Sequence, residues 1–293
     1  MRRTYWVIAA LALLATACSQ RANGTIPQFA APADSSLRPS TGPRIDHVTV
    51  VMMENRDYAS VIGVPEAPYI NKTLVARGAL LTNSHAVSHP SEPNYLAIFS
   101  GSTQGVASDD CPLTFSAANL GRELIASGKS FRGYSESMPH DGYTGCGDNG
   151  YERKHNPWAS FTNVPKSSNL IYRPSRVPGS AMADVTFVVP NLDDDMHDGS
   201  TQQGDTWLSK HLPSIVAWNA KHNGLLIVTW DEASPDDGTN PIATIFVGPM
   251  VKAGVRSKQH VDHYAVLRTI ENAFGIPCTA NACKRVPISG IWK

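Results

Sequence analysis

The sequence has little that suits a nucleic-acid-binding or a membrane-spanning protein. Its 293 residues carry 25 Lys and Arg against 25 Asp and Glu, and only 17% of them are charged. Without a basic excess, the composition argues against a broad nucleic-acid-binding surface. The apolar run at Tyr5–Ala17 is too short to cross a bilayer as a helix. There is no internal repeat, and the length allows one large domain.

Cysteine is scarce, and no pair has the CxxC spacing typical of a structural metal site. Apart from Cys18, the chain has Cys111, Cys146, Cys278 and Cys283. In an exported protein four cysteines indicate two disulfides, with three ways of pairing them. Proximity in sequence favours Cys278–Cys283, which leaves Cys111–Cys146.

The N-terminus, MRRTYWVIAALALLATACSQ, indicates export. Two arginines precede a short apolar run that ends in small residues, which is the pattern of a signal peptide over residues 1–17. The stretch Ala15–Cys18 is similar to a bacterial lipobox. We therefore predict a lipid anchor at Cys18 in the cell envelope as the chain's membrane contact. The alternative is an ordinary signal peptide and a secreted protein. Cleavage before Cys18 removes Arg2 and Arg3 and leaves 23 basic against 25 acidic residues.

Residues 18–44 are rich in Pro, Ser, Ala and Gly and lack a hydrophobic period, so we expect a flexible tether. The remainder, 45–293, is predicted to form one α/β domain with a mainly parallel sheet, because apolar strands alternate with helical patterns. Residues 141–180 show little regular pattern and are expected to form a wall or lid over a site. We expect strands at 47–53, 79–87, 130–135, 184–189, 225–230 and 242–247, and helices at 69–77, 91–100, 117–127, 205–222 and 263–274.

Polar residues follow four of these strands at the point where each strand ends. Glu54 and Asn55 follow the first strand, His89 and Ser91 follow the second, and an acidic run ending in His197 follows a later one. Asp231 and Glu232 directly follow the apolar run LLIVTW. Ligands of open α/β sheets bind beyond the carboxyl ends of the strands. We therefore expect these side chains to meet at one edge of the sheet.

Ser91 lies in the stretch HPSEPNYLAIFSG, just ahead of an apolar helical run. A serine at this position either caps the helix or serves as a nucleophile in the positive field of the helix N-terminus. Pro90 and Pro93 stiffen the turn and limit where the side chain points. Asn94, one turn further, is a candidate donor to an anionic oxygen.

The oxygen ligands Glu54, Asn55, Asp231 and Glu232 suit a hard divalent cation such as Mg²⁺, Ca²⁺ or Mn²⁺. Zn²⁺ stays open because His197 and His263 are available. Two adjacent carboxylates repel each other unless a cation or an arginine relieves them, which favours metal binding at Asp231 and Glu232. A cation beside Ser91 would lower the pKa of its hydroxyl.

As a set, these motifs resemble the phosphoesterase family of bacterial and fungal acid phosphatases and bacterial phospholipases C, within the alkaline phosphatase-like superfamily. They follow the family's order from Val48 to Trp292. The stretches that carry the resemblance are Glu54–Arg56, HPSEPNYLAIFSG, KHNPW at Lys154–Trp158, the PN…HDG run at Pro190–Gly199, TWDE at Thr229–Glu232 and HYAVLRTIENAFGIP at His263–Pro277.

The resemblance implies a three-layer α/β/α fold and hydrolysis through a phosphoserine on Ser91. It places Asn94, His155 and His197 around the phosphate. It gives the metal to the four oxygen ligands named above, among which Glu232 stands where some relatives have aspartate. We expect one metal ion, since the ligand set of two-metal superfamily members cannot be assembled here.

Three functions remain open at this stage. The first is a metal-dependent acid phosphatase acting on phosphomonoesters. The second is a phosphodiesterase of the phospholipase C type. The third is an envelope lipoprotein that binds a ligand and has lost catalysis. The nucleophile and ligand positions are all chemically competent, which argues against the third. The larger phospholipases of the family carry extra C-terminal domains, whereas this sequence ends at Lys293 soon after the last motif, so we expect the first function over the second.

Overall fold

We describe the protein from a computed structural model, which describes residues 42–179, 182–234 and 238–293. These residues all belong to one compact unit, Ser36–Lys293. The predicted signal peptide, the lipid anchor at Cys18 and most of the tether at 18–44 lie outside the described residues. No helix in the described part of the chain is long and apolar enough to span a bilayer.

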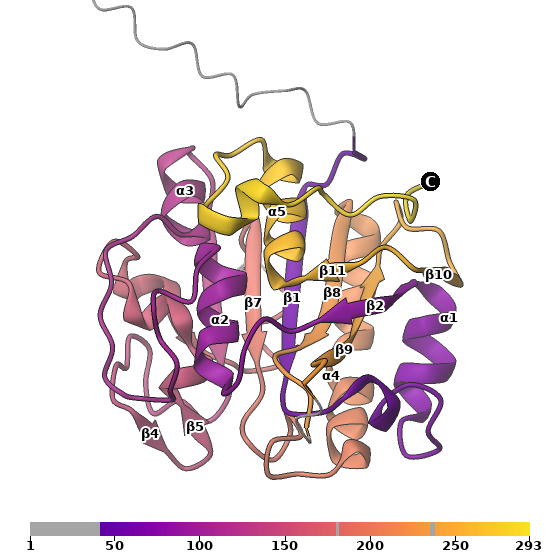
Figure 1. Cartoon of the computed structure of the whole chain (residues 1–293), viewed down its shortest axis with the longest axis horizontal. Coiled ribbons are helices and arrows are strands. Elements are labelled where there is room, and N and C mark those ends of the chain that lie inside the picture. Colours follow the sequence, from indigo (N-terminus) through magenta and orange to yellow (C-terminus); the bar gives the residue numbers. More distant parts are fainter. Residues whose placement is uncertain (1–41, 180–181, 235–237) are drawn as a thin grey trace, which may run out of the picture. The chain divides into compact units, whose positions relative to one another are not determined.

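A nine-stranded sheet forms the middle layer, with the order β10-β2-β9-β8-β1-β7-β3-β6 and with β11 paired to β2 (Figure 1). β1 and β8 lie at its centre as parallel, fully paired strands whose ends, Met53 and Trp230, are in register. The strands are β1 His47–Met53, β2 Ala79–His85, β3 Phe131–Ser135, β6 Asn169–Ile171, β7 Val185–Val189, β8 Gly224–Trp230, β9 Pro241–Val247, β10 Val255–Ser257 and β11 Val261–Asp262.

Helices cover both faces of the sheet, as expected for strands that are apolar on both sides. One apolar core lies under α2, α3 and α5. A second core on the other face lies under α1 and α4. The helices are α1 Val75–Arg77, which continues the π-helical turn Ile70–Leu74, α2 Ser91–Ser100, α3 Leu120–Ala126, α4 Thr201–Lys221 and α5 His263–Phe274. The α/β fold predicted from the sequence is confirmed.

Several details differ from the sequence-based expectations. The strand expected at 79–87 ends at His85, and the helix expected at 117–127 begins at Leu120, because the Asn119 side chain caps it. β9 runs antiparallel to both of its neighbours, β8 and β2, within the otherwise parallel sheet. α4 begins at Thr201 instead of residue 205, because Ser200 and Gln203 form a reciprocal capping box ahead of it.

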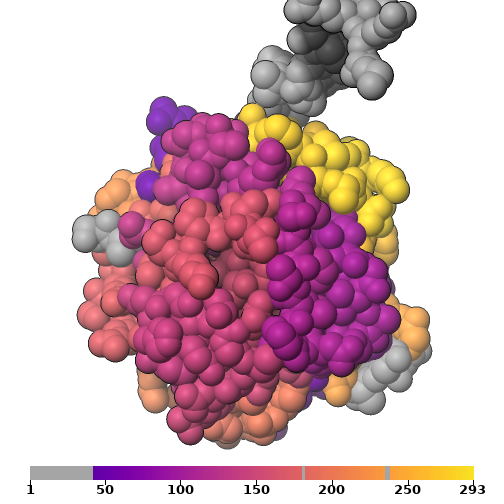
Figure 2. All heavy atoms as spheres, turned by 90° about the vertical axis from the view of Figure 1, so that its left-hand side faces the viewer, coloured from indigo at the N-terminus to yellow at the C-terminus, as the bar shows by residue number. Residues whose placement is uncertain are grey.

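The long connection between β3 and β7 covers much of the face seen in Figure 2. It is more regular than expected, with a short hairpin of β4 Gly147–Asp148 and β5 Tyr151–Glu152 followed by 3₁₀ turns. The Arg153 guanidinium holds it together by donating to the carbonyls of Thr144, Leu113 and Ala159. Gly133 of β3 leaves room for the Trp158 indole, which a Cβ there would overlap. The disulfides are Cys111–Cys146 and Cys278–Cys283, as proximity in sequence favoured.

Candidate active site

The site begins where β1 and β8 end side by side. The Asp231 N–H donates to the Met53 carbonyl, which extends the ladder by one residue and sets Glu54 next to Asp231. Asn55 then turns the chain away with φ of 35°, a left-handed conformation that asparagine tolerates better than most residues. Its N–H donates to Asp231 Oδ1 over 3.0 Å. Both acids are fully buried.

Ser91, the first residue of α2, brings its hydroxyl into this cluster. Ser91 Oγ lies 3.2 Å from Glu54 Oε2 and 3.2 Å from Glu232 Oε1, and 3.3 Å from Asn55 Oδ1. Only 1% of the residue is exposed. Side chains from two other segments therefore converge on the Ser91 hydroxyl oxygen, as the sequence predicted for the ends of the strands.

The cap interpretation of Ser91 is wrong. The residue before α2 is Pro90, and no side chain caps the helix. Ser91 has helical geometry, and its hydroxyl bonds to residues of other elements instead of to the helix's own N–H groups. The Glu92 N–H at this helix end donates to Asp109 Oδ1 over 2.9 Å, and the Lys154 ammonium donates to Oδ2 of the same carboxylate.

The carboxylates of the site resist ionisation together. Burial raises the pKa of Glu54 well above its usual value, and the charges of Asp231 and Asp195 raise it further. Burial, followed by the charge of Glu232, raises the pKa of Asp231 to about 7. Within the described residues, Glu54 and Glu232 have histidines as ion-pair partners and no lysine or arginine. A divalent cation would relieve this repulsion.

The individual oxygen atoms also fit a cation. Asp231 Oδ2 is buried and accepts no hydrogen bond. The Asn55 amide lies among oxygen atoms of Glu54, Ser91 and Glu232. Hydrogen bonding alone favours the orientation in which its nitrogen donates to all three, over 3.0 Å to Glu54 Oε2, whereas a cation would favour its oxygen there. The Ser91 hydroxyl is a shared donor to these oxygens, and with the amide oxygen turned inward the carboxylate and amide oxygens together make the donor set of a hard cation. Glu54, Asn55, Asp231 and Glu232 are therefore the residues that would hold it.

Tyr95 lies one helical turn after Ser91 and donates its hydroxyl to Glu54 Oε1. It is fully buried, and burial followed by the charge of Glu54 raises the pKa of the phenol well above its usual value, so the hydroxyl keeps its proton. Because Tyr95 binds one carboxylate oxygen of Glu54, the other oxygen is turned toward Ser91.

Two histidines form the side of the site that belongs to the β3–β7 connection and the loop after β7. His155 stacks on the Tyr95 ring, with its Nε2 3.3 Å from Glu54 Oε1 and its Nδ1 3.7 Å from Asp195 Oδ2. Burial lowers the pKa of His155 well below its usual value, so the imidazole is neutral. The His197 ring lies 5.8 Å from the His155 ring, and His197 Nδ1 faces Asp198 Oδ1 at 2.7 Å.

Glu54, His155 and His197 also bring one ligand atom each within 4.8 Å of one another, which is a second geometry able to hold a metal ion. The Glu54 oxygen near His155 Nε2, at 3.3 Å, is Oε1, to which Tyr95 also donates. Imidazole nitrogens favour a softer ion such as Zn²⁺ over Mg²⁺ or Ca²⁺. A metal site at this edge is thus supported, and the identity of the ion is left to experiment.

Two further histidines contact the two acids after β8, His89 at the Glu232 carboxylate and His263 at the Asp231 backbone. His89 Nδ1 lies 2.6 Å from Glu232 Oε2. His263, the first residue of α5, places Nε2 2.6 Å from the Asp231 carbonyl oxygen, so this nitrogen carries the proton. Asp262, not His263, caps α5.

The Asn94 side chain hydrogen-bonds to the backbone of the turn that precedes α2. Its Oδ1 accepts from the N–H groups of Val87 and Ser88, and its Nδ2 donates to the carbonyls of Ser88 and Pro90. The residue is fully buried. These four hydrogen bonds fix the turn that carries His89 and Ser91, while its role as a donor to phosphate stays a prediction.

The sequence did not single out Tyr95, Asp195 or Asp109. Tyr95 had a usable signal, because residues four apart lie on the same face of a helix and Ser91 was already a candidate. Asp195 and Asp109 are acids in polar loops with no periodic pattern. Only the folded chain brings them to His155 and to the start of α2.

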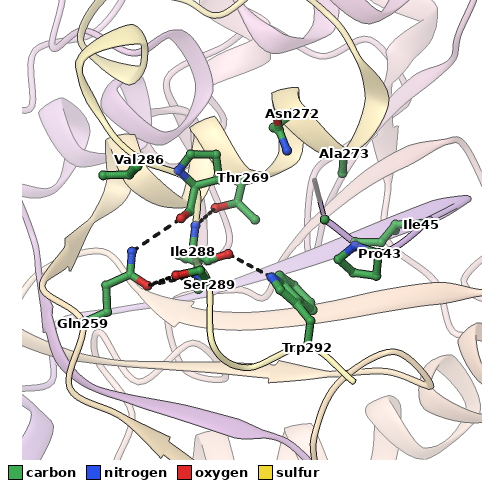
Figure 3. Close-up of a pocket in the computed structure, with 12 residues that line it drawn as sticks. Pro43, Ile45, Gln259, Thr269, Asn272, Ala273, Val286, Ile288, Ser289 and Trp292 are labelled. Carbon is green, nitrogen blue, oxygen red and sulfur yellow. Dashed lines mark hydrogen bonds between the residues drawn. The ribbon is translucent and has the colours of Figure 1, made fainter. Parts of the chain in front are cut away.

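An apolar cavity of about 320 Å³ lies far from this chemistry, at the end of the sheet where β1 begins (Figure 3). Its polar groups bond to one another. Ser289 N–H donates to Gln259 Oε1, Ile288 N–H donates to Thr269 Oγ1, and the Trp292 indole donates to the Ile288 carbonyl.

Residues 64–277 match the model of the Phosphoesterase family. A phosphatidylinositol-3-phosphatase of Mycobacterium tuberculosis is 41% identical over 299 residues, which span 100% of this chain and 96% of that protein. A phosphate-repressible acid phosphatase of Penicillium chrysogenum is 28% identical and aligns over 84% of this chain and 64% of its own length.

Solved structures resemble the fold at low identity. A protein of the alkaline phosphatase superfamily from Vibrio parahaemolyticus has a TM-score of 0.57 at 11% identity, covering 86% of this chain and 72% of its own. A periplasmic domain from Escherichia coli in complex with zinc has a TM-score of 0.53 at 11% identity, covering 82% and 85%.

Proposed function

The chain belongs to the phosphoesterase family and is a hydrolase of phosphoric esters, and from this premise we propose that it is a metal-dependent phosphomonoesterase with Ser91 as nucleophile. The observation that carries the proposal is the position of the Ser91 hydroxyl. It is buried at the N-terminus of α2 and lies 3.2 Å from a carboxylate oxygen of Glu54 and from one of Glu232.

The residues of the site can carry out each step of a nucleophilic displacement at phosphorus. Ser91 Oγ forms a bond to phosphorus as the bond to the leaving alcohol breaks, and the serine proton passes to Glu54 or Glu232. His197 is the less buried of the two site histidines and is the candidate to protonate the leaving oxygen. Water then hydrolyses the phosphoserine, which releases phosphate and restores Ser91. A divalent cation held by the four oxygen ligands would lower the pKa of the Ser91 hydroxyl and offset the charge of the phosphate.

The relatives favour a monoester over a diester. Those described above carry phosphatase names, and the mycobacterial one aligns over nearly its whole length. Phosphatidylinositol 3-phosphate, the substrate in that relative's name, is the first physiological monoester to test.

The distinguishing assay compares p-nitrophenyl phosphate with bis(p-nitrophenyl) phosphate, each with EDTA and after re-addition of Mg²⁺, Ca²⁺, Mn²⁺ or Zn²⁺. We expect faster, metal-dependent turnover of the monoester. Preference for the diester would transfer the assignment to a phospholipase C-type enzyme. If the folded, metal-loaded protein hydrolyses neither substrate, the remaining hypothesis is a lipoprotein that binds a ligand without catalysis.

The nucleophile is tested with Ser91→Ala. We expect turnover to fall by roughly 10³-fold or more with the fold intact, and phosphoserine to be trapped by acid quench of the wild type alone. Ser100→Ala is the matched control, because Ser100 is equally buried at the other end of α2 and bonds to the Leu96 carbonyl. Retained activity in Ser91→Ala would remove the nucleophile assignment.

A further inference from the structure

The charge of the chain is unevenly distributed along the sequence. The whole chain is neutral, with 25 basic and 25 acidic residues. Residues 249–293 alone carry seven basic residues against two acids, which leaves 18 basic and 23 acidic residues in the remainder. Both acids, Asp262 and Glu271, are buried, whereas six of the seven basic residues are exposed. The surface that this stretch builds is therefore positively charged.

Two segments of this stretch lie side by side and bring four lysines onto one surface. The Lys252 N–H donates to the Ile291 carbonyl over 2.8 Å, and the Lys293 N–H donates to the Met250 carbonyl over 2.9 Å. Residues 250–259 therefore run along residues 284–293. The exposed lysines of the two segments, which we call the lysine surface, are Lys252, Lys258, Lys284 and Lys293.

No acid pairs with these lysines. Within the described residues, none of the four forms an ion pair. The Lys284 ammonium donates to Asn281 Oδ1, and the Lys293 ammonium donates to the Pro249 carbonyl, so both acceptors are neutral. The charge of the lysine surface is thus left to attract an anionic partner.

An exposed apolar side chain lies next to these lysines. Val286, two residues after Lys284, is 75% exposed, more than any other large hydrophobic side chain in the described residues. It lines the apolar cavity of about 320 Å³ together with Ile288 and Trp292, the residue before Lys293 (Figure 3). A single exposed valine is ordinary, but one beside an apolar cavity and within a basic surface is typical of a site that binds a membrane interface.

The position of this cavity in the fold leaves the active site uncovered. Gly42 and Pro43, which precede β1, line the cavity. The residues before them lead back to Cys18, for which the sequence predicts a lipid anchor. The active site lies at the other end of β1, where Glu54 follows the strand. A bilayer at the cavity would therefore not cover Ser91.

The lysines and the apolar side chain together select the partner. A nucleic acid would match the lysines but leave Val286 and the cavity in water, and an uncharged apolar ligand would leave the lysines unmatched. A bilayer with anionic lipids pairs its headgroups with the lysines and covers the valine with its apolar interior. We propose that the lysine surface and Val286 form a docking site for an anionic lipid bilayer.

The test is co-sedimentation with lipid vesicles. The protein is residues 18–293 with Cys18→Ser, made without the signal peptide so that no lipid is attached. It contains the whole compact unit, Ser36–Lys293. We expect binding to vesicles of equal parts phosphatidylcholine and phosphatidylglycerol that weakens as salt is added, and no binding to pure phosphatidylcholine. Binding is measured without turnover, so its outcome is independent of the proposed phosphatase activity.

Variants separate the two contributions. Lys252→Gln combined with Lys258→Gln should weaken vesicle binding by about 25-fold, since each lysine near an anionic surface contributes about 5-fold. Val286→Ser should weaken it by about 5-fold, because the valine no longer enters the apolar layer. The matched control is Lys210→Gln combined with Lys221→Gln. Both lysines are exposed on α4, which covers the other face of the sheet, so this variant should bind like the wild type.

Three results would overturn the proposal. The first is failure of the folded wild-type chain to bind the anionic vesicles. The second is equal weakening by the α4 control, which would mean that any lysine contributes. The third is loss of binding in the lysine variant but not in Val286→Ser, with full competition by heparin, which would make the surface a site for polyanions in general.

Discussion

Ser91 and Tyr95 are four residues apart on α2, so one helix face carries both the proposed nucleophile and the hydroxyl that donates to Glu54. The Tyr95 hydroxyl bonds to the Glu54 oxygen that faces away from Ser91. Groups that orient a metal ligand in this way typically affect metal affinity by about 10–100-fold.

We therefore expect Tyr95→Phe to raise the metal concentration needed for half-maximal turnover by about 10-fold, with kcat at saturating metal changed far less. Titration of the EDTA-treated variant with the activating ion measures this. Tyr151→Phe is the control, since the buried Tyr151 hydroxyl accepts from Asn156 and not from a site carboxylate. An unchanged metal titration in Tyr95→Phe would mean that Glu54 needs no orienting donor.

Asp231→Asn is expected to have opposite effects on metal binding and on metal-free stability. The variant loses a proposed metal ligand, so its metal content by elemental analysis should fall. In EDTA it should be more stable than the wild type by about 1–3 kcal/mol, because the carboxylate whose pKa is raised to about 7 by burial and Glu232 is gone. Unfolding by urea in EDTA measures this, and equal metal content in variant and wild type would exclude Asp231 as a ligand.

At the scale of the elements, sequence signals were strongest where capping residues stand at both ends. The predicted bounds of α5 are confirmed, because Asp262 caps its first turn and Gly275 ends it in a left-handed conformation. The predicted start of α4 was too late, because the capping residues Ser200 and Gln203 come before the apolar pattern of the helix begins. The antiparallel direction of β9 had no local signal, because strand direction depends on pairing and not on the strand's own residues.

The candidate site was predictable to the extent that it lies at the ends of strands. Glu54 and Asp231 follow apolar runs directly, and Ser91 lies in the loop after the next strand, so the rule for parallel sheets is enough to bring them together. Asp109 and Asp195 needed the fold, because the loops that carry them have no period to fix their position. His155 was named through the family resemblance, and its stacking on Tyr95 was not foreseen.

α5 also carries a titratable group that makes stability depend on pH. Glu271 is fully buried, and burial raises its pKa from 4.5 to about 7, against the hydrogen bonds donated by Thr279. Between these values the folded state holds a proton that the unfolded state has lost. The free energy of unfolding should therefore fall as pH rises from about 4.5 to about 7, by up to about 3 kcal/mol.

Glu271→Gln, which mimics the protonated acid, should remove this part of the pH dependence. Urea unfolding of wild type and variant at pH 5 and pH 8 measures it, with the exposed Glu66→Gln as control. Equal slopes of stability against pH in all three proteins would contradict the assignment to Glu271.

For the whole molecule, the two disulfides constrain very different lengths of chain. Cys111–Cys146 spans a separation of 35 residues and Cys278–Cys283 a separation of 5. Loop-closure entropy alone assigns them about 4 and about 2 kcal/mol. The longer loop also links the Asp109 segment, which contacts the start of α2, to the segment that carries Lys154 and His155.

Replacing Cys111 and Cys146 together by serine should lower the melting temperature more than replacing Cys278 and Cys283, and it alone should also lower kcat/KM. Calorimetry and the monoester assay on the two double variants measure both effects. The same loss of activity in both would show that the longer bridge has no special link to the site.

The division of the site between strand ends and the β3–β7 connection has a consequence for how such a chain can diverge. Glu54 and Asp231 directly follow the central strands β1 and β8. His155 and the wall around it come from a separate stretch of sequence, which the Cys111–Cys146 disulfide tethers. We therefore expect the strand-end acids and this connection to vary independently among relatives. Exchange of residues 136–184 with those of a relative is predicted to change the preferred substrate while Glu54, Asp231 and Glu232 stay in place.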